Sequence, residues 1–350
     1  MERTQRKIKN ILIVNTGARG DVLRTSGILS PLLRKFNHSS ISWVVGEESY
    51  EVLEDNALLE RVIIYRREEP DNFRSILDTL HLDLIINLEE DPCLAELLNE
   101  INTEIIGFIV EKGLIIPTAS AVRYWEMGLY GPRPDNNILK KNNRMTYQDM
   151  LKEILTLDHY VACPEIKIGL TEEKMAVKLI SKKIKNDNIL IGINFGSGSR
   201  WPTKRLPLGL VINIIEAMEK KDNIKILIFA GEDEKKEARM LLEKFPGLTI
   251  AQSVPYKVFA ALIHRCRLLI TTDTFALHIA IAVGTEVLAY FGPTSAYEIE
   301  LYGLGEKFIT SLECSCCYKK NCNKEPFCMD DFSIVENIEA RLTGLIDRLN

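Results

Sequence analysis

The 350-residue sequence lacks long apolar runs, a surplus of positive charge and a secretory pattern at its start. No apolar run reaches the roughly 18–20 residues of a membrane-spanning helix, and the stretch 276–292 is interrupted by His278, Gly284 and Glu286. Lysine and arginine number 44 against 49 acidic residues, and this net charge of −5 argues against a bulk nucleic-acid binder. The opening segment, MERTQRKIKN, has charge but no apolar core. We therefore expect a cytoplasmic protein, in which any contact with the inner face of the cytoplasmic membrane is peripheral.

Strong catalytic signatures are missing as well. The sequence contains no Ser-His-Asp signature, no HExxH zinc helix and no EF-hand loop. It also has neither the Gly-Lys-Ser/Thr of a Walker A loop nor a complete GxGxxG fingerprint. Function must therefore be inferred from weaker signals and from their order along the chain.

Two series of short apolar runs separated by helix-length segments are present. The first predicts strands at 10–15, 41–46, 62–65, 82–88 and 104–108, and the second at 189–194, 224–230, 248–251, 268–272 and 287–291. Such alternation is typical of βαβ units and parallel sheets. We expect two open α/β sheets in series, in domains at residues 1–160 and 161–350, with an irregular segment at 111–145 and a C-terminal helix at 333–349.

The loop after the first predicted strand, Gly17-Ala-Arg19-Gly20-Asp21, precedes a helix expected to run from Asp21 to about Phe36. Its glycines allow close backbone approach to a ligand, and a helix N-terminus favours anions. Asp21 could equally be only an acid favoured by the helix dipole. The loop by itself does not decide between these interpretations.

Three loops in the second half follow predicted strands in the same way. The segment 195–207 places Gly196 and Ser197 before three cations that include Lys204, a pattern suited to phosphate, although a solvated loop would look similar. Glu232 and Asp233 could accept hydrogen bonds from a ribose, or could simply begin a solvated helix. The third loop carries Asp273, Thr274 and His278, of which a lone histidine is more often structural than catalytic. Ligands of open α/β sheets bind at such strand ends, so one nucleotide-bearing ligand would explain the order.

The cysteines are unevenly distributed. Five of the eight lie between residues 314 and 328, and without an export signal such a cluster indicates metal binding before disulfides. Cys314, Cys317, Cys322 and Cys328 have the spacing C-x2-C-x4-C-x5-C, which predicts one structural zinc or iron ion in a finger at 312–330. A reduced, metal-free loop is the alternative. Cys316 is the fifth thiol of the cluster, and an exchange of ligand between Cys316 and Cys317 is open.

Three segments, residues 11–29, 193–207 and 268–294, resemble the ADP-heptose:lipopolysaccharide heptosyltransferases of glycosyltransferase family 9. The resemblance implies a GT-B fold, α/β with two Rossmann-like parallel-sheet domains facing across a cleft, the first binding the acceptor and the second the nucleotide sugar. It implies inverting transfer without a catalytic metal, from a nucleotide-diphosphate sugar such as ADP-heptose to a glycolipid, glycan or protein hydroxyl, as in lipopolysaccharide biosynthesis. Related protein-glycosylating enzymes hold iron in a similar cysteine finger.

Site roles follow from the resemblance, residue by residue. Asp21 matches the candidate base, in an acceptor-side loop with Gly17, Arg19 and Gly20, and Lys204 matches the lysine that neutralises the donor phosphates. The donor-binding set is Gly196, Ser197, Lys204, Glu232, Asp233, Asp273, Thr274 and His278. One departure is Phe275, which stands where the family usually has glycine and could narrow the site or change the donor pose.

Two other functions fit parts of the sequence. A non-catalytic sugar-nucleotide-binding or scaffold protein would explain Phe275, but the presence of Asp21 and Lys204 argues against it. A zinc-ribbon interaction module fused to an α/β domain would explain the cysteines. The acceptor and the oligomeric state are not encoded in any pattern that we recognise, and no nucleic-acid partner is expected.

Overall fold

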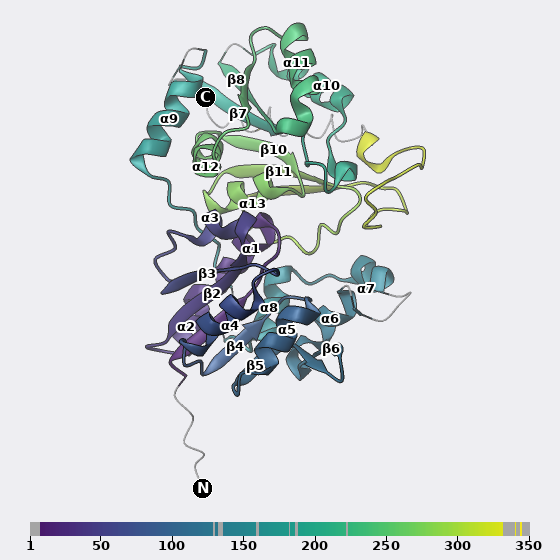
Figure 1. The fold of residues 1–350 in the computed structure, drawn as a ribbon. Coiled ribbons are helices and arrows are strands. Elements are labelled where there is room, and N and C mark those ends of the chain that lie inside the picture. The colour runs from purple at the N-terminus through teal and green to yellow at the C-terminus, as the bar shows by residue number, and fades with distance from the viewer. Residues whose placement is uncertain are drawn as a thin grey trace. The chain divides into compact units, whose positions relative to one another are not determined.

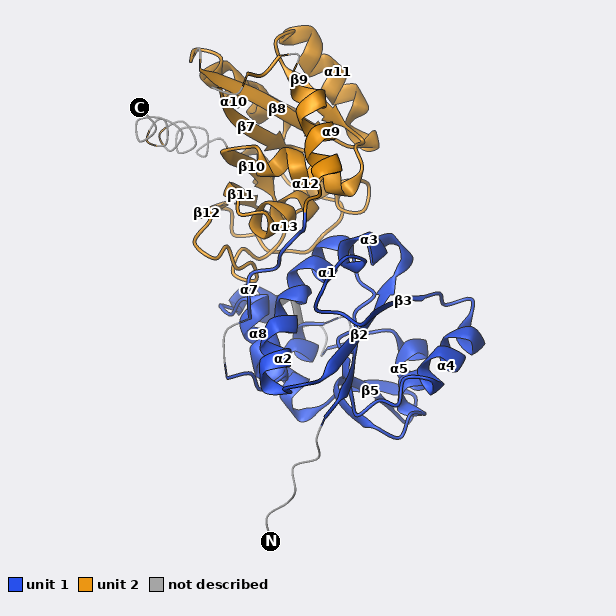
Figure 2. Cartoon of the chain, turned by 90° about the vertical axis from the view of Figure 1, so that its left-hand side faces the viewer, with its two compact units in different colours: residues 1–167 blue, residues 168–350 orange. Residues whose placement is uncertain are grey.

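A computed structural model describes residues 8–128, 130–131, 136–158, 161–181, 183–185, 188–221, 223–331, 340 and 344. The chain divides into two compact units, residues 1–167 and 168–350, each built on one six-stranded sheet (Figures 1 and 2). This division falls a few residues after the domain boundary proposed from the sequence at 160/161. The predicted helix 333–349 lies almost entirely outside the described residues.

The sheet of unit 1 has the strand order β3-β2-β1-β4-β5-β6. Its strands are β1 (Asn10–Val14), β2 (Ser40–Gly46), β3 (Arg61–Tyr65), β4 (Leu84–Asn87), β5 (Glu104–Glu111) and β6 (Leu114–Pro117). All neighbours are parallel except β5 and β6. Alternate residues of β1 enter different apolar clusters, Ile11 and Ile13 one cluster and Leu12 and Val14 another. The central strand is therefore covered on both faces, as a parallel sheet requires.

The helices of unit 1 follow its strands. They are α1 (Arg19–Thr25), α2 (Leu29–Lys35), α3 (Tyr50–Leu53), α4 (Pro70–Asp78), α5 (Pro92–Asn99), α6 (Val122–Met127), α7 (Asn136–Asn142) and α8 (Tyr147–Ile154). The single helix expected from Asp21 to Phe36 is interrupted by a 3₁₀ turn at Ser26–Ile28. A Cβ at Gly27 would lie 2.1 Å from the Ala162 carbonyl oxygen. The backbone at residue 162 therefore packs so closely against residue 27 that a side chain there would clash with it.

Unit 2 repeats the same architecture. Its sheet order, β12-β11-β10-β7-β8-β9, places β7 and β10 side by side at the centre. The strands are β7 (Ile189–Asn194), β8 (Ile224–Ala230), β9 (Thr249–Gln252), β10 (Leu268–Thr272), β11 (Glu286–Phe291) and β12 (Gly305–Ile309), all parallel to their neighbours. The helices are α9 (Leu170–Ile180), α10 (Leu208–Met218), α11 (Lys235–Lys244), α12 (Tyr256–His264) and α13 (Phe275–Ala282). Cys328 and Met329 join the apolar core that α10 and α11 share with the sheet.

The expectation that residues 111–145 are irregular was wrong. β6 pairs with β5 across a tight turn in which Lys112 and Gly113 adopt φ values of 53° and 76°, and α6 and α7 follow. The glycine permits that turn, and the apolar run Leu114-Ile-Ile supplies the edge strand. β12 was likewise not predicted. No described helix is long and apolar enough to cross a membrane.

Candidate functional site

The first strand-end loop presents Asp21 in the first turn of α1. The Asp21 side chain is 47% exposed and forms an ion pair of 2.8 Å with Arg24 one turn later. The Arg24 guanidinium in turn lies 4.0 Å above the Tyr147 ring. Arg19 faces another partner, donating to the Glu48 carbonyl at 2.6 Å and pairing with Glu51 at 2.9 Å. The loop thus offers one accessible carboxylate whose position is restrained by an arginine.

Hydrogen bonds from the side chains of Asn15 and Thr25 fix the backbone of this loop. The Asn15 side chain accepts from the Gly17 N–H at 3.3 Å and donates to Thr25 Oγ1 at 3.2 Å. The Thr25 hydroxyl donates to the Asp21 carbonyl at 2.6 Å and lies 2.9 Å from the Tyr147 hydroxyl. The backbone on both sides of Asp21 is therefore held although its carboxylate faces solvent.

Glu89 contacts the same loop and was not among the residues proposed from the sequence. It follows β4, the parallel neighbour of β1, and accepts from the Thr16 N–H at 2.9 Å and the Thr16 hydroxyl at 2.8 Å. Burial raises the pKa of Glu89, and the bonds from Thr16 oppose that shift only in part. Its position directly after an apolar strand was the signal that could have identified it.

In unit 2 the structure brings Lys204 and Asp273 together. The Lys204 ammonium donates to Asp273 Oδ2 at 2.7 Å and to the Asp273 carbonyl at 3.1 Å. Both side chains are largely buried, at 15% and 14% exposure. Burial by itself would raise the pKa of Asp273, but the charges of Lys204 and His278, with hydrogen bonds from Lys204 and Thr294, lower it well below its usual range. The pair is therefore a pre-formed cation and anion at the end of β10.

Asn194, also missed in the sequence, connects the loops after β7 and β10. Its side-chain amide donates to the Gly196 carbonyl at 3.1 Å and to the hydroxyls of Thr271 and Thr274 at 3.3 and 3.2 Å. Thr274 occupies the N-cap position of α13 but makes no side-chain cap bond. The Thr274 hydroxyl therefore accepts a hydrogen bond from Asn194 in the neighbouring loop and does not cap α13.

The acidic turn after β8 divides into exposed and buried carboxylates. Glu232 and Asp233, the two acids proposed from the sequence, are exposed, and Glu232 bonds Lys235 and Ser253. Glu234 is 3% exposed, accepts from the Gly231 N–H at 3.0 Å and pairs with Arg205 at 3.0 Å. A Cβ on Gly196 would come within 2.4 Å of the Glu234 carboxyl carbon, so Gly196 rests directly on this acid.

Ser197 and Phe275 each contact one neighbouring residue. Ser197 donates its hydroxyl to the Trp201 carbonyl at 2.7 Å, closing the loop after β7. Phe275, the departure from the family pattern, stacks on the Tyr256 ring with a centroid distance of 5.5 Å. The phenyl ring is thus accommodated against α12.

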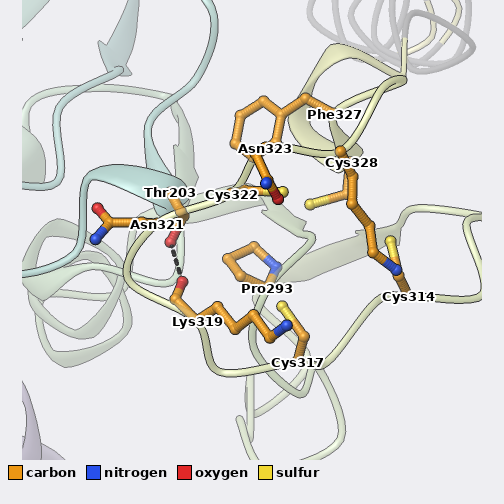
Figure 3. A pocket seen from close by; sticks show the side chains of 11 residues that line it. Thr203, Pro293, Cys314, Cys317, Lys319, Asn321, Cys322, Asn323, Phe327 and Cys328 are labelled. Carbon is orange, nitrogen blue, oxygen red and sulfur yellow. Dashed lines mark hydrogen bonds between the residues drawn. The ribbon is translucent and has the colours of Figure 1, made fainter.

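The four predicted metal-ligating cysteines line one cavity of about 110 Å³ (Figure 3). All eight cysteines of the chain are free thiols. Burial, followed by the charges of Cys317, Cys314 and Cys322, raises the pKa of Cys328 to about 12. The Cys316 side chain instead bonds Tyr318 and Ser295. Across the described residues, no group of three or more His, Cys, Asp or Glu side chains is arranged so that it could hold a metal ion, and the metal site stays a prediction.

Sequence comparison and structure comparison both match this chain to heptosyltransferases. A sequence model of glycosyltransferase family 9 (heptosyltransferase) matches residues 132–327. Lipopolysaccharide heptosyltransferase 1 of Pseudomonas aeruginosa is 22% identical over 330 residues, which cover 90% of this chain and 88% of the relative.

Two solved structures show the fold. The E. coli ADP-heptose lipopolysaccharide heptosyltransferase II aligns with a TM-score of 0.67 and 12% identity, covering 97% of this chain and 99% of that one. The iron-containing dodecameric glycosyltransferase TibC from enterotoxigenic E. coli aligns with a TM-score of 0.56 and 10% identity, over 97% and 80% of the two chains. The prediction of an α/β GT-B fold with two parallel-sheet units is confirmed.

Proposed function

Because the chain belongs to glycosyltransferase family 9, the heptosyltransferases, we propose that it transfers heptose from ADP-heptose to a hydroxyl acceptor with inversion. The observation that carries the proposal is the buried Lys204–Asp273 pair, which lies after β10 beside the Gly196 loop. The names of two relatives, an ADP-heptose heptosyltransferase and a lipopolysaccharide heptosyltransferase, support this donor.

On the donor side, Lys204 supplies the positive charge for the diphosphate. Gly196 and Ser197 bring backbone N–H groups to the same loop, and such groups bind phosphate well. When the bond between the anomeric carbon and the diphosphate breaks, its electron pair moves to a phosphate oxygen, and a nearby ammonium stabilises the charge that develops. Asp273, with Thr274 and His278 beside it, is proposed to accept hydrogen bonds from sugar hydroxyls. The acidic turn with Glu232 and Asp233 is proposed to face the ribose.

On the acceptor side, Asp21 acts as the general base. The acceptor oxygen forms the new bond to the anomeric carbon on the face opposite the leaving ADP, and its proton passes to the Asp21 carboxylate. The exposure of Asp21 suits this task, since a large acceptor must reach it. The mechanism requires no catalytic divalent cation, because Lys204 and backbone N–H groups provide the positive potential.

The acceptor is proposed to be a lipopolysaccharide-type glycolipid, on the strength of the relatives' names. Other glycans and protein hydroxyls are the competing acceptors. A lipid-linked acceptor would place the enzyme at the inner face of the cytoplasmic membrane through peripheral contact. No nucleic-acid partner is proposed.

We also propose that the finger at 312–330 holds one structural zinc or iron ion. Four cysteine side chains surround a single cavity, and thiolates suit either metal (Figure 3). TibC, a structural relative, is described as iron-containing. Four protein ligands would leave no open position, so no step of the transfer passes through the ion.

The donor proposal is tested by incubating the full-length protein with ADP-heptose, UDP-glucose, GDP-mannose and ADP alone. We expect ADP and ADP-heptose to raise the melting temperature, and ADP-heptose to release ADP slowly by hydrolysis or quickly with a lipopolysaccharide-core acceptor. If no nucleotide sugar raises the melting temperature or releases nucleotide, the proposal is wrong.

The metal proposal is tested by elemental analysis of anaerobically purified protein. We expect close to one equivalent of zinc or iron in the wild type, because such sites fill as they fold. Cys322→Ser should lose the metal, whereas Cys316→Ser, a matched control in the same loop, should keep it. Less than about a fifth of an equivalent in the wild type would contradict the site.

A further inference from the structure

The segment from Cys314 to Cys328, here called the cysteine loop, forms hydrogen bonds with Thr203, the neighbour of Lys204, and with residues 292–295, which include a hydrogen-bond partner of Asp273. All of these residues belong to unit 2. The loop therefore contacts the segments that carry Lys204 and the hydrogen-bond partner of Asp273.

The first connection runs to Lys204. Its neighbour Thr203 is 6% exposed and donates its hydroxyl to the Lys319 carbonyl of the cysteine loop at 2.7 Å (Figure 3). Thr203 and Lys204 belong to the same 3₁₀ turn, Pro202–Lys204. The backbone from which the Lys204 side chain extends is thus held by the cysteine loop.

The second connection runs to Asp273 through residues 292–295, which follow β11. The N–H groups of Cys316 and Tyr318 donate to the carbonyls of Gly292 and Pro293 at 2.9 and 2.8 Å. In return the Ser295 N–H donates to the Tyr318 hydroxyl at 3.2 Å. Thr294, between these anchored residues, hydrogen-bonds Asp273.

The Tyr318 hydroxyl is itself fixed, because it donates to Glu298 at 2.8 Å. Gly292 lies so close to the cysteines that a Cβ there would be 2.7 Å from Cys328 Sγ. The segment carrying Thr294 therefore lies between the cysteine loop and the donor-site carboxylate.

We propose that the cysteine loop supports nucleotide binding by fixing the donor site. In this proposal Thr203 is a positioning residue for Lys204, and Tyr318 is a positioning residue for Asp273. The proposal rests on the proposed function, since it assigns these contacts to binding of the nucleotide diphosphate. A lysine side chain has several rotatable bonds, so its charge is well placed only when its backbone is fixed. Loosening the loop should weaken nucleotide binding even where the fold survives.

The same coupling must operate in the other direction. If an ordered cysteine loop favours nucleotide binding, nucleotide binding must favour the ordered loop by the same factor. Cys328 and Cys266 are both buried thiols of unit 2, at 6% and 4% exposure, but only Cys328 belongs to the loop. ADP should therefore protect Cys328 more than Cys266.

The test compares Thr203→Val with Thr285→Val, which remove the same hydroxyl from buried threonines of unit 2. Thr285 donates to the Ile263 carbonyl at 2.9 Å, just before β11 and therefore at the opposite end of the strand from residues 292–295. Titration calorimetry with ADP should show affinity roughly 3- to 10-fold weaker for Thr203→Val, the range that one net hydrogen bond corresponds to. Thr285→Val should stay within twofold of the wild type, and Thr203→Ser should restore most of the affinity.

Equal ADP affinities for the two valine variants overturn the proposal, whatever their melting temperatures. If Thr203→Val does not fold, Tyr318→Phe takes its place, and wild-type ADP affinity in folded Tyr318→Phe overturns the proposal in the same way. Labelling of the wild type with iodoacetamide, followed by mass spectrometry, supplies the reciprocal readout. A wild type that binds no ADP refutes the proposed function and this inference together, whereas ADP binding without the difference between variants refutes the inference alone.

Discussion

Asp21 in unit 1 and Asp273 in unit 2 follow central strands of two sheets with equivalent strand order, yet their surroundings differ. The Asp21 side chain is 47% exposed and pairs with an arginine on its own helix. The Asp273 side chain is 14% exposed and pairs with Lys204, which is 69 residues away in sequence. One carboxylate is restrained locally, and the other is held by tertiary structure.

This difference fits two different tasks. A buried ion pair with fixed partners is pre-organised, so it can recognise one small charged group without rearrangement. An exposed carboxylate on a fixed backbone leaves room for a large acceptor. We therefore expect changes at Asp21 to alter turnover, and changes at the Lys204–Asp273 pair to alter donor affinity and stability.

The largest effect is expected from Asp21→Asn. The amide keeps the shape of the carboxylate but cannot take a proton, so turnover should fall by about 10²–10⁴, the usual contribution of a general base. ADP affinity, measured by calorimetry, should stay nearly unchanged. Asp71→Asn is the matched control, because Asp71 is also an exposed acid in the first turn of a helix in unit 1. A mutant at Asp21 that retains most of its turnover would remove this residue from the mechanism.

Asp273→Asn should have the next largest effect, on stability. Because the pKa of Asp273 is lowered in the fold, its contribution is fully present above the unfolded value near 3.9 and is lost as pH falls through the folded value. Urea unfolding at pH 7 should show Asp273→Asn less stable by roughly 2–4 kcal/mol, somewhat below the cost of breaking a fully buried pair.

The pH dependence sharpens this result. The gap between wild type and Asp273→Asn should narrow as pH is lowered below about 4, because the unfolded wild-type chain then binds a proton at Asp273 before the folded protein does. A gap that stays constant between pH 7 and pH 3 would contradict the low pKa of Asp273. Asp71→Asn again serves as the exposed control.

Lys204→Met should weaken ADP binding and turnover together. In the proposed mechanism the ammonium contacts both the bound and the departing diphosphate. A charge-assisted hydrogen bond is worth about 1.5–3 kcal/mol, or roughly ten- to more than a hundred-fold. Lys220→Met, at an exposed position just beyond the end of α10, removes the same charge as a control. Unchanged ADP affinity in Lys204→Met would move the phosphate site elsewhere.

Most strands of both sheets could be predicted from the sequence, because the central strands are continuous apolar runs bounded by helical segments. The edge strands β6 and β12 could not, since only one of four residues in β6 and none of five in β12 is buried. Such strands are identified by a neighbour in the sheet, which hydrophobic pattern alone does not reveal.

The sequence proposed single residues for the candidate site, and it missed Glu89, Asn194 and the contacts between the residues that it did propose. Lys204 and Asp273 were each identified from a strand-end loop, yet their ion pair depends on β7 and β10 lying side by side. The bond from Thr203 to Lys319 joins residues 116 positions apart and has no local signature. Glu234 was passed over for Glu232 and Asp233 because burial within a run of acids is decided by tertiary packing.

The smallest expected effect concerns Glu89, whose pKa is shifted in the opposite direction to that of Asp273. Burial raises the pKa of Glu89 in the fold, so its contribution to stability is full below the unfolded value near 4.3 and is lost as pH rises through the folded value. Glu89→Gln cannot ionise, and its amide oxygen can still accept from Thr16. Urea unfolding should therefore show Glu89→Gln gaining stability relative to the wild type as pH rises from 4 to 7, while Glu96→Gln, exposed on α5, shows no such trend. Parallel pH curves for Glu89→Gln and wild type would mean that the Thr16 bonds fully offset burial, and that both units hold their strand-end carboxylates as stable anions.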